Sequence, residues 1–476
     1  MRVLMLGWEF PPYITGGLGT ACYGLTRAMS GRGTQISFVL PKHVGGEYTS
    51  HVKMLAPQSR RAEAGDRAPD SVASTFIADP KPTPVDTQGK EAFRNVVFKA
   101  VPSHMASVYP GGGLQYTPTG TRKTEGIGFI HSKPATQSET SEVVSTAVTD
   151  APPPPAVDFD YSGDLFQQTR RYADLCLDLA KGEDFDIIHA HDWLTFPAAQ
   201  AVAEATGKPW VAHVHSTEYD RAGEGANTQI AAFEKQGVLA ADRVIAVSEF
   251  TRKILVSRFG LDKHKCDVVY NGVEQNIKNG VEKSTPVAPP AGIKKGEKVV
   301  LYLGRVTIQK GPEYFIAAAK KVLEKMDNVK FVVAGSGDQI ERTIEQAAKA
   351  GIGSKITFTG FLRGADVKRV YEMADVYVMP SVSEPFGIAP LEAIAHDVPV
   401  IISKQSGVSE VLEHALKVDF WDTHDIANKI IAVLRHPPLG KTMREHADLE
   451  VRELTWDGAA EKCESVYDEL LGAVVS

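Results

Sequence analysis

Cysteine is scarce in this chain, which has four among 476 residues. Cys22, Cys176, Cys266 and Cys463 lie far apart and fit no spacing typical of a zinc or redox site. So few and so widely separated thiols also argue against a disulfide framework, which is typical of short secreted chains. We therefore expect a protein of a reducing compartment.

Long apolar runs are also absent. No stretch approaches the roughly 20 residues that a membrane-spanning helix needs. The N-terminal MRVLMLGWEF has too short an apolar run for a signal peptide, and no small-residue cleavage site follows it. The sequence predicts a soluble, cytoplasmic protein without a membrane span.

An excess of positive charge is the third feature that the chain lacks. It has 52 Lys and Arg against 59 Asp and Glu, a formal net charge of -7 and a pI near 6.1. This balance argues against a protein that coats nucleic acid or anionic lipid. We expect no nucleic-acid partner, although a net negative charge is compatible with local basic sites that bind small anions.

The chain does have a regular alternation of short apolar runs and helical segments. Its 476 residues exceed what one hydrophobic core usually serves, so two domains are expected. The apolar runs read as strands buried on both faces, as in a doubly wound parallel sheet. The expected fold class is α/β, with two Rossmann-type domains facing across a cleft. The expected strands cover 2–8, 35–41, 185–193, 209–216, 242–248 and 266–273 in the first half, and 298–305, 329–337, 355–361, 375–381 and 399–404 in the second.

Composition places the domain boundaries. Residues 1–275 form the expected N-terminal domain, with an insertion at about 44–160 that is rich in Ser, Thr, Ala and Pro. Within the insertion only 93–101 reads as a strand, and we expect the rest to be largely disordered. The remaining segments are a linker at 276–297, a second domain at 298–454 and an amphipathic C-terminal helix at 455–476.

In open parallel sheets, ligands bind beyond the carboxyl ends of the strands, so each strand-to-helix junction is a candidate site. The first junction is the loop TGGLG, where Gly16 and Gly17 would let a ligand approach the backbone closely. The loop is not the dinucleotide fingerprint G-x-G-x-x-G, and no acid follows the second strand at the expected distance. A tight turn explains these glycines equally well.

The segment GRVTIQKG at 304–311 is the first junction of the second domain. Arg305 and Lys310 follow the strand at a place where helix amides also point. Two cations there suit a pyrophosphate. The alternative is a solvated charged loop, and we favour the anion site because both cations fall on the cleft side.

The segment SEPFGIAPLEAIA carries two carboxylates eight positions apart. Glu384 lies on a Pro/Gly loop, and Glu392 lies about one turn into the helix that we expect to follow. Each acid can accept hydrogen bonds from the hydroxyls of a sugar or a ribose, while the local alternative is that both only stabilise the helix dipole. The helix-start amides near Gly387, Ile388 and Ala389 can bind a phosphate.

Two histidine patterns, HAHDW and HVHST, end neighbouring strands. Two H-x-H patterns suggest a metal, but one face of a buried strand is usually packed, so we expect His189 and His213 to be structural. Asp192, His215 and Glu218 lie at strand ends and are the better site candidates.

Together these segments resemble the retaining glycosyltransferases of the two-Rossmann type called GT-B, and within them the family-four group that includes glycogen synthase-like enzymes. The resemblance rests on GGLG, HAHDW, HVHSTEYDR, VVYNGV, GRVTIQKG, AGSG, GFLRG and the Glu-x7-Glu of SEPFGIAPLEAIA. These motifs are spread over nearly the whole chain except 44–160. The closing TWDGAAEKC resembles the helix that braces the first domain in this fold.

The resemblance implies a role for each candidate. Arg305 and Lys310 would hold the donor pyrophosphate and neutralise the leaving nucleoside diphosphate. Glu392 would bind the ribose, Glu384 would contact the hydroxyls of the donor sugar, and His215 would lie near the reacting carbon. Further donor contacts are implied at Gly16, Gly17, Gly335, Leu362, Gly387, Ile388 and Ala389, and acceptor-side positions at Asp192 and Glu218.

Charge develops on the departing diphosphate, so preorganised cations and helix amides are the main catalytic tool. With Arg305 and Lys310 in that role, we expect neither a metal nor another cofactor. Retention of the anomeric configuration is implied by the family. A two-carboxylate mechanism would need an acid beside the anomeric carbon, and the sequence does not place one.

One position departs from the family pattern. Bacterial starch and glycogen synthases that use ADP-glucose carry Lys-x-Gly-Gly near the N-terminus, and Ile14 takes the place of that lysine here. The donor is therefore open between ADP-glucose, UDP-glucose and another nucleotide sugar. We expect glucosyl transfer to an α-glucan, with two alternatives: a small-sugar or lipid-linked acceptor, and a non-catalytic nucleotide-sugar binder.

Overall fold

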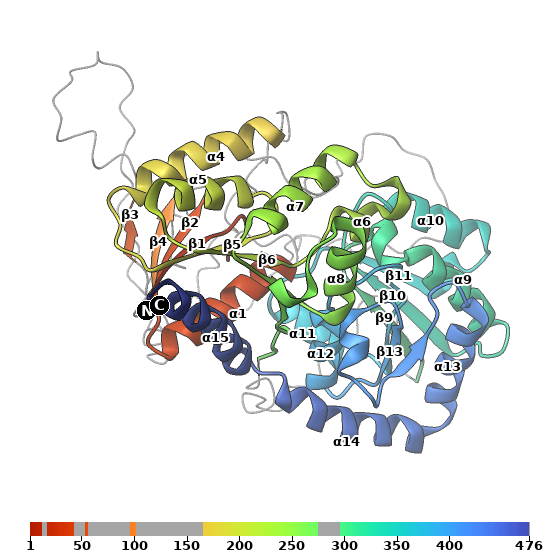
Figure 1. Ribbon diagram of the computed structural model, residues 1–476. Helices are drawn as coiled ribbons and strands as arrows, with labels where there is room; N and C mark the ends of the chain where they lie inside the picture. The colour runs from red at the N-terminus through yellow and green to blue at the C-terminus, as the bar shows by residue number, and fades with distance from the viewer. Residues whose placement is uncertain (12–16, 42–52, 56–95, 101–164, 275–295, 476) are drawn as a thin grey trace, which may run out of the picture.

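The computed structural model describes residues 1–11, 17–41, 53–55, 96–100, 165–274 and 296–475. These residues form two α/β domains, each built on one parallel sheet with helices on both faces (Figure 1). The α/β fold with two doubly wound parallel sheets is the one that the alternating apolar runs predict.

The first sheet has eight strands in the order β3-β4-β2-β1-β5-β6-β7-β8, and each neighbouring pair is parallel. Helices α4, α5 and α7 cover one face, and α1 and α15 cover the other. The strands are β1 (Arg2–Leu6), β2 (Gln35–Leu40), β3 (Lys53–Leu55), β4 (Val96–Ala100), β5 (Ile187–His191), β6 (Trp210–Val214), β7 (Arg243–Ala246) and β8 (Cys266–Val268). The helices are α1 (Gly17–Gly31), α4 (Leu165–Ala180), α5 (Phe196–Thr206), α6 (Glu218–Ala222), α7 (Thr228–Ala240) and α8 (Glu249–Ile254).

The second sheet has six parallel strands in the order β11-β10-β9-β12-β13-β14. Helices α9, α10 and α13 pack on one face, and α11, α12 and α14 on the other. The strands are β9 (Lys298–Leu303), β10 (Val329–Ala334), β11 (Ile356–Gly360), β12 (Val376–Met379), β13 (Val400–Ser403) and β14 (Leu416–Val418). The helices are α9 (Pro312–Leu323), α10 (Ile340–Lys349), α11 (Ala365–Glu372), α12 (Ile388–Ala395), α13 (Thr423–Arg435) and α14 (Pro437–Glu453).

The last helix, α15 (Trp456–Val475), leaves the second domain and packs on the first beside α1, so that both chain ends lie together (Figure 1). The Val273 N–H donates to the Leu454 carbonyl at 3.0 Å where the chain crosses over. Gly24 of α1 allows the close approach of the two helices, because a Cβ there would lie 2.2 Å from the Trp456 indole.

Two short strands are not predicted by the sequence pattern. β3 lies inside the stretch 44–160, so the expectation of a single strand there was wrong, and β14 closes the second sheet. Each has three residues, too few to show a period, and each is defined by pairing with a longer neighbour, β4 or β13. β4 itself falls within the expected strand at 93–101. The rest of 44–160 and most of the expected linker lie outside the described residues.

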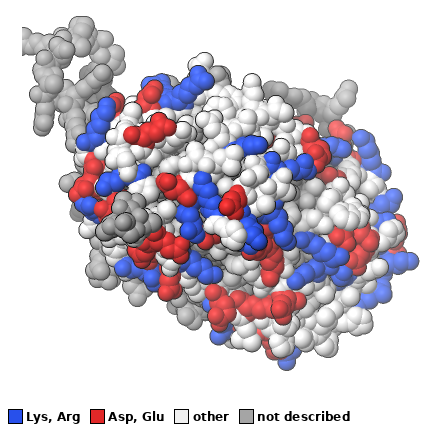
Figure 2. All heavy atoms as spheres, viewed as in Figure 1, with Lys and Arg blue, Asp and Glu red and all other residues white. Residues whose placement is uncertain are grey.

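Among the described residues, no helix is both long enough and apolar enough to span a membrane. Lys and Arg side chains are interspersed with Asp and Glu over the face shown in Figure 2. That mixture matches the mild net negative charge of the sequence.

Candidate active site

The loops that follow the strands of the two sheets meet at the boundary between the domains. The Ser383 hydroxyl, after β12, donates to Oδ1 of Asp220 in α6 at 2.6 Å. The Ser248 hydroxyl, after β7, donates to the Pro385 carbonyl at 2.5 Å. The carboxyl ends of both sheets therefore face one another, which is where open parallel sheets bind ligands.

Lys310 and Glu384 are brought together from two different junctions. Lys310 ends the short 3-10 helix after β9, and its Nζ lies 2.5 Å from Oε2 of Glu384 on the loop after β12. The Ser381 hydroxyl donates to the same carboxylate oxygen at 3.3 Å. Gly311, with φ 63°, permits the turn into α9, because a Cβ there would lie 2.2 Å from the Pro380 carbonyl. The predicted cation and acid thus form one partly buried pair.

Three of the candidate donor contacts follow neighbouring strands, Arg305 after β9, Gly335 after β10 and Leu362 after β11. Arg305 follows β9 and is partly exposed, and its carbonyl accepts a hydrogen bond from the Tyr302 hydroxyl at 2.8 Å. Gly335 follows β10 and donates its N–H to the Gly360 carbonyl at 2.8 Å. A Cβ at Gly335 would lie 1.9 Å from the Gly304 carbonyl oxygen, so only glycine fits there. Leu362, after β11, is partly buried.

The start of α12 has the form predicted for an anion site. Gly387 precedes the helix with φ 108°, and no side chain caps it. The first-turn amides of Ile388 and Ala389 are therefore not used by a capping side chain and carry the positive end of the helix dipole. Glu392 lies one turn further on, and its Oε2 accepts from the Tyr371 hydroxyl at 3.0 Å. Burial raises the pKa of Glu392, while the Tyr371 hydrogen bond lowers it.

Asp192 and His215 lie side by side at the ends of β5 and β6. Asp192 has a left-handed backbone with φ 59°, uncommon outside glycine, and its Oδ1 accepts from the His215 N–H at 2.7 Å. Burial raises the pKa of Asp192 to about 7. Burial also lowers the pKa of His215 to about 3, so its imidazole is neutral at physiological pH.

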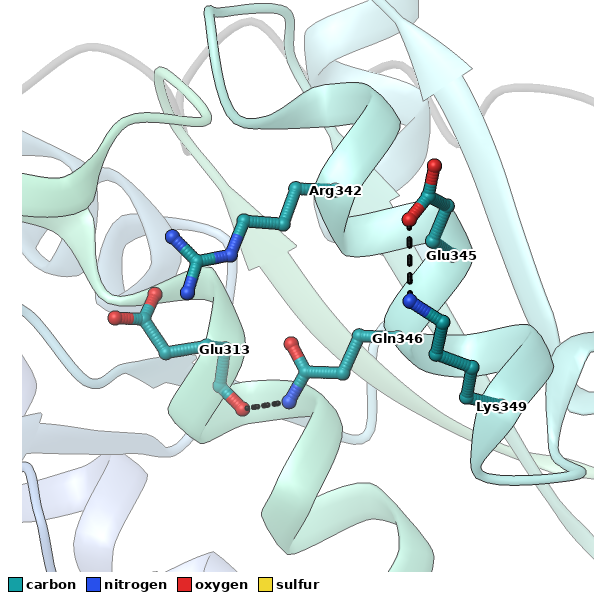
Figure 3. A pocket seen from close by; sticks show the side chains of 5 residues that line it. All are labelled: Glu313, Arg342, Glu345, Gln346 and Lys349. Carbon is teal, nitrogen blue, oxygen red and sulfur yellow. Dashed lines mark hydrogen bonds and ion pairs between the residues drawn. The ribbon is translucent and has the colours of Figure 1, made fainter.

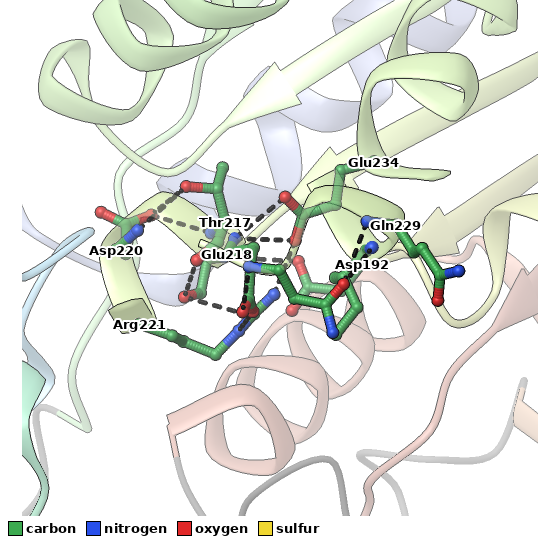
Figure 4. A network of polar contacts seen from close by, with 10 residues as sticks. Asp192, Thr217, Glu218, Asp220, Arg221, Gln229 and Glu234 are labelled. Carbon is green, nitrogen blue, oxygen red and sulfur yellow. Dashed lines mark hydrogen bonds and ion pairs between the residues drawn. The ribbon is translucent and has the colours of Figure 1, made fainter. Parts of the chain in front are cut away.

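Glu218 belongs to a buried polar network at α6, shown in Figure 4. Arg221 binds Glu218 through Nε at 2.9 Å and Glu234 through Nη2 at 2.6 Å. The backbone N–H of Glu218 also donates to both Glu234 oxygens at 2.9 Å. The acceptor-side candidate is thus held in a cluster in which one cation binds two carboxylates.

Several residues of this boundary were missed by sequence reasoning. Asp220 both caps α6 with Thr217 and bonds Ser383 of the other domain, and the Thr-x-x-Asp capping box is the local signal that marks it. Glu410 accepts from the backbone N–H groups of Glu249 and Phe250 at 2.9 and 2.6 Å. No local pattern indicates the Glu410 contacts, because they join residues about 160 positions apart.

The N-terminal glycine loop is only partly described. Gly17 is exposed at the first position of α1, and a Cβ there would meet nothing within 4 Å. Gly16 and Ile14 lie outside the described residues. The expected close approach of this loop to a donor therefore stays a prediction.

Two further clusters of charged side chains lie away from the boundary between the domains. A pocket between α9 and α10 is lined by Glu313, Arg342, Glu345, Gln346 and Lys349, in which Gln346 bonds the Glu313 carbonyl (Figure 3). The Asp-x-Asp triplet at 184–186 precedes β5, and both carboxylates pair with Arg2.

Comparisons with known proteins bear on this geometry. A model described as Glycosyl transferases group 1 matches residues 287–449, Glycosyltransferase Family 4 matches 134–276, and Starch synthase catalytic domain matches 2–77. A glycosyltransferase of Methanocaldococcus jannaschii is 34% identical over 296 residues, which cover 60% of this chain and 75% of the relative.

Two relatives with a named activity match over shorter spans. A D-inositol 3-phosphate glycosyltransferase of Segniliparus rotundus is 28% identical, covering 57% of this chain and 64% of the relative. A glycogen synthase of Mycobacterium tuberculosis is 30% identical, covering 48% and 54%. In structure, sucrose-phosphate synthase from Thermosynechococcus elongatus is similar in fold, with a TM-score of 0.65 and 18% identity over 99% of both chains.

Two parallel-sheet domains that meet at their strand-end loops have the GT-B fold, as the resemblance implied. The chain belongs to the glycosyltransferases, and its residues 287–449 match the group 1 model.

Proposed function

We propose that this enzyme is a retaining glycosyltransferase that moves glucose from a nucleotide sugar to an α-glucan. The donor site in this proposal rests on one observation, the Lys310–Glu384 ion pair beside the start of α12. A cation, a carboxylate and uncapped helix amides in one place suit a sugar diphosphate, whose phosphates need positive partners and whose hydroxyls need acceptors.

In this proposal, Arg305 and Lys310 neutralise the charge that develops on the leaving diphosphate. The amides of Ile388 and Ala389 add positive potential at the same end of the helix. Glu392 binds the ribose, in an orientation set by the Tyr371 hydroxyl. We propose that the reaction needs no metal, because these fixed charges supply the electrostatic stabilisation.

Retention follows in the proposal from a same-face transfer rather than from a covalent intermediate. Glu384 accepts from both Lys310 and Ser381, so its carboxylate is stabilised as a hydrogen-bond acceptor rather than as a free nucleophile. In that role it holds the donor sugar through its hydroxyls, and the acceptor hydroxyl attacks from the face that the diphosphate leaves.

The proposed acceptor rests on the excess of carboxylates over cations in the network at α6. Arg221 is the cation of this network, and it already binds the carboxylates of Glu218 and Glu234. A phosphorylated acceptor would have to compete with two carboxylates for that cation. A neutral, hydroxyl-rich glucan chain can use the carboxylate oxygens as acceptors without breaking the ion pairs.

Transfer to a small sugar is the second candidate, and the named activity of the Segniliparus relative favours it. We leave the nucleotide open between ADP and UDP. The starch synthase and glycogen synthase matches favour the α-glucan acceptor.

Release of nucleoside diphosphate from ADP-, UDP- and GDP-sugars tests the proposal, with and without glycogen, maltooligosaccharides or small sugars. Release from ADP- or UDP-glucose that rises only with α-glucan, together with an α-configured product by NMR, is the expected result. Release stimulated only by a small sugar or a sugar phosphate overturns the acceptor. A β-configured product overturns retention, and donor binding without release on any acceptor overturns transfer itself.

A further inference from the structure

Four histidines form a buried cluster on one face of the first sheet. In the β5–β6 pairing His191 lies opposite His213, so the alternation of side chains places His189, His191, His213 and His215 on one face. The Tyr467 hydroxyl of α15 contacts Nδ1 of His189, which identifies this as the face covered by α15. Each of the four side chains is at most 9% exposed. The two H-x-H patterns in the sequence show that each strand places two histidines on one face. Only the cross-strand register shows that the histidines of β5 and β6 lie side by side.

The hydrogen bonds within the cluster leave ring nitrogens unsatisfied. His189 Nε2 bonds His213 Nδ1 at 3.0 Å, and His191 Nδ1 bonds His215 Nε2 at 2.9 Å. The Nε2 atoms of His191 and His213 and the Nδ1 atom of His215 are buried and have no partner in the described part of the chain. A buried polar atom without a partner costs about 1–3 kcal/mol, so three of them in one cluster require an explanation.

The nitrogens of three of these rings are close enough to share one ion. Ligand atoms of His189, His191 and His213 all lie within 4.8 Å of one another. Metal–nitrogen bonds of about 2.0–2.1 Å at the tetrahedral angle separate two nitrogens by about 3.3 Å. The 3.0 Å between His189 Nε2 and His213 Nδ1 is already near that value.

The outer partners orient two of these rings as in known metal sites. A ligating histidine normally donates its second ring N–H to a neighbouring group. Here Nδ1 of His189 contacts the Tyr467 hydroxyl, and Nδ1 of His191 contacts His215. Nε2 of His191 is thereby left free to coordinate, and Nε2 of His189 faces Nδ1 of His213, whose hydrogen bond an ion would replace.

We propose that His189, His191 and His213 form a binding site for one divalent transition metal ion of the Zn²⁺ class, enclosed between the first sheet and its covering helices. The ion is structural and takes no part in bond making. Coordination through His191 Nε2 leaves its Nδ1–H to donate to His215 Nε2. The proton of His215 then resides on Nδ1, so the ion also sets the tautomer of a candidate donor-site residue. This inference does not rest on the proposed substrates.

Metal content and spectroscopy of the full-length protein test the proposal. Protein expressed with added zinc and dialysed against EDTA is expected to retain about one equivalent of Zn²⁺. Cobalt-loaded protein is expected to show the intense visible bands of tetrahedral Co²⁺ without thiolate charge transfer, and X-ray absorption of the zinc form to show imidazole ligands at about 2.0 Å.

The ligand variant His213→Ala is expected to lose the tight zinc, with affinity reduced by about 100-fold or more. His264→Ala, which removes an exposed imidazole of the same domain, is the matched control and is expected to bind as the wild type does. Zinc-free wild-type protein, an octahedral cobalt spectrum, or wild-type zinc binding in His213→Ala would each overturn the site. If His213→Ala fails to fold, the wild-type stoichiometry and absorption data decide the question alone, because a hydrogen-bonded histidine cluster without metal gives neither.

Discussion

Lys310 Nζ lies 2.5 Å from Glu384 Oε2, and this contact joins two strand-end loops that are 74 residues apart in sequence. The two side chains are 19% and 9% exposed, so water screens the pair only partly. A donor diphosphate that binds beside the pair, on the Lys310 side, would meet a cation whose position is already fixed.

Replacing Lys310 by alanine is expected to lower kcat about 100-fold or more, because the leaving diphosphate loses a preorganised cation. The loss of unfolding free energy should stay within about 1–3 kcal/mol, since Glu384 keeps the Ser381 hydroxyl as a partner. Steady-state kinetics and urea unfolding of the same preparation measure both. Lys310→Arg retains the charge and serves as the control. Wild-type kcat and KM in Lys310→Ala would show that the lysine has no role in the reaction.

Glu392→Ala should reduce kcat/KM for the donor by about 10- to 100-fold, the value of one lost hydrogen bond to a charged group. Tyr371→Phe tests whether orientation contributes, because it removes only the hydroxyl that bonds Glu392 and the Ala389 carbonyl. We expect a smaller loss in Tyr371→Phe, by less than about tenfold. Equal donor affinity in Glu392→Ala and wild type, measured by calorimetry with the nucleoside diphosphate, would exclude the ribose contact.

Asp220 should make stability depend on pH. Burial raises its pKa in the folded state above the unfolded value, so the native protein binds this proton more tightly than the unfolded chain does. Its contribution is therefore fully present below the unfolded pKa of about 3.9 and is lost as pH rises through the folded pKa.

The variant Asp220→Asn removes this titration and keeps an acceptor for Ser383. The free energy of unfolding of the variant minus that of wild type is expected to increase as pH rises from 4 to 8, because wild type loses the Asp220 contribution over that range. Urea unfolding across that range measures the difference. Asp178→Asn, which changes a carboxylate that is 73% exposed, controls for the loss of one negative charge. If the free energies of unfolding of Asp220→Asn and wild type changed equally with pH, the link between Asp220 titration and stability would be contradicted.

Gly24→Ala should destabilise the protein by about 1–3 kcal/mol through overpacking, because the new methyl would lie 2.2 Å from Cε2 of Trp456. Gly31→Ala, in the same helix, meets nothing within 4 Å and is expected to change stability by less than about 1 kcal/mol. Thermal unfolding of the two variants separates packing from helix propensity. Equal midpoints would mean that α1 and α15 are not packed as described.

The sequence predicts those parts of the molecule that local periodicity determines. Each run that the sequence pattern assigns to a strand contains a strand, because burial on both faces of a parallel sheet leaves a clear signal. The alternation at Lys53–Leu55 and Leu416–Val418 is too short to be recognised, and pairing with longer strands defines these elements.

The candidate site likewise contains residues that local patterns predict and contacts that they do not. Lys310, Glu384 and Glu392 could be named from their loops because strand ends and helix starts are local features. The partners that hold them could not, because Ser383 with Asp220 and Lys310 with Glu384 are contacts between distant segments. The same limit applies to the four histidines, whose strand pattern is visible while their cross-strand bonds are not.

The return of α15 to the first domain has a consequence for biosynthesis. Trp456, Cys463 and Tyr467 complete a core that residues near the N-terminus begin, whereas β9 to β14 and the helices between them are contiguous in sequence. Domains usually fold in the order in which they leave the ribosome. In this chain the later domain can finish first, and the earlier one must wait until α15 has been translated.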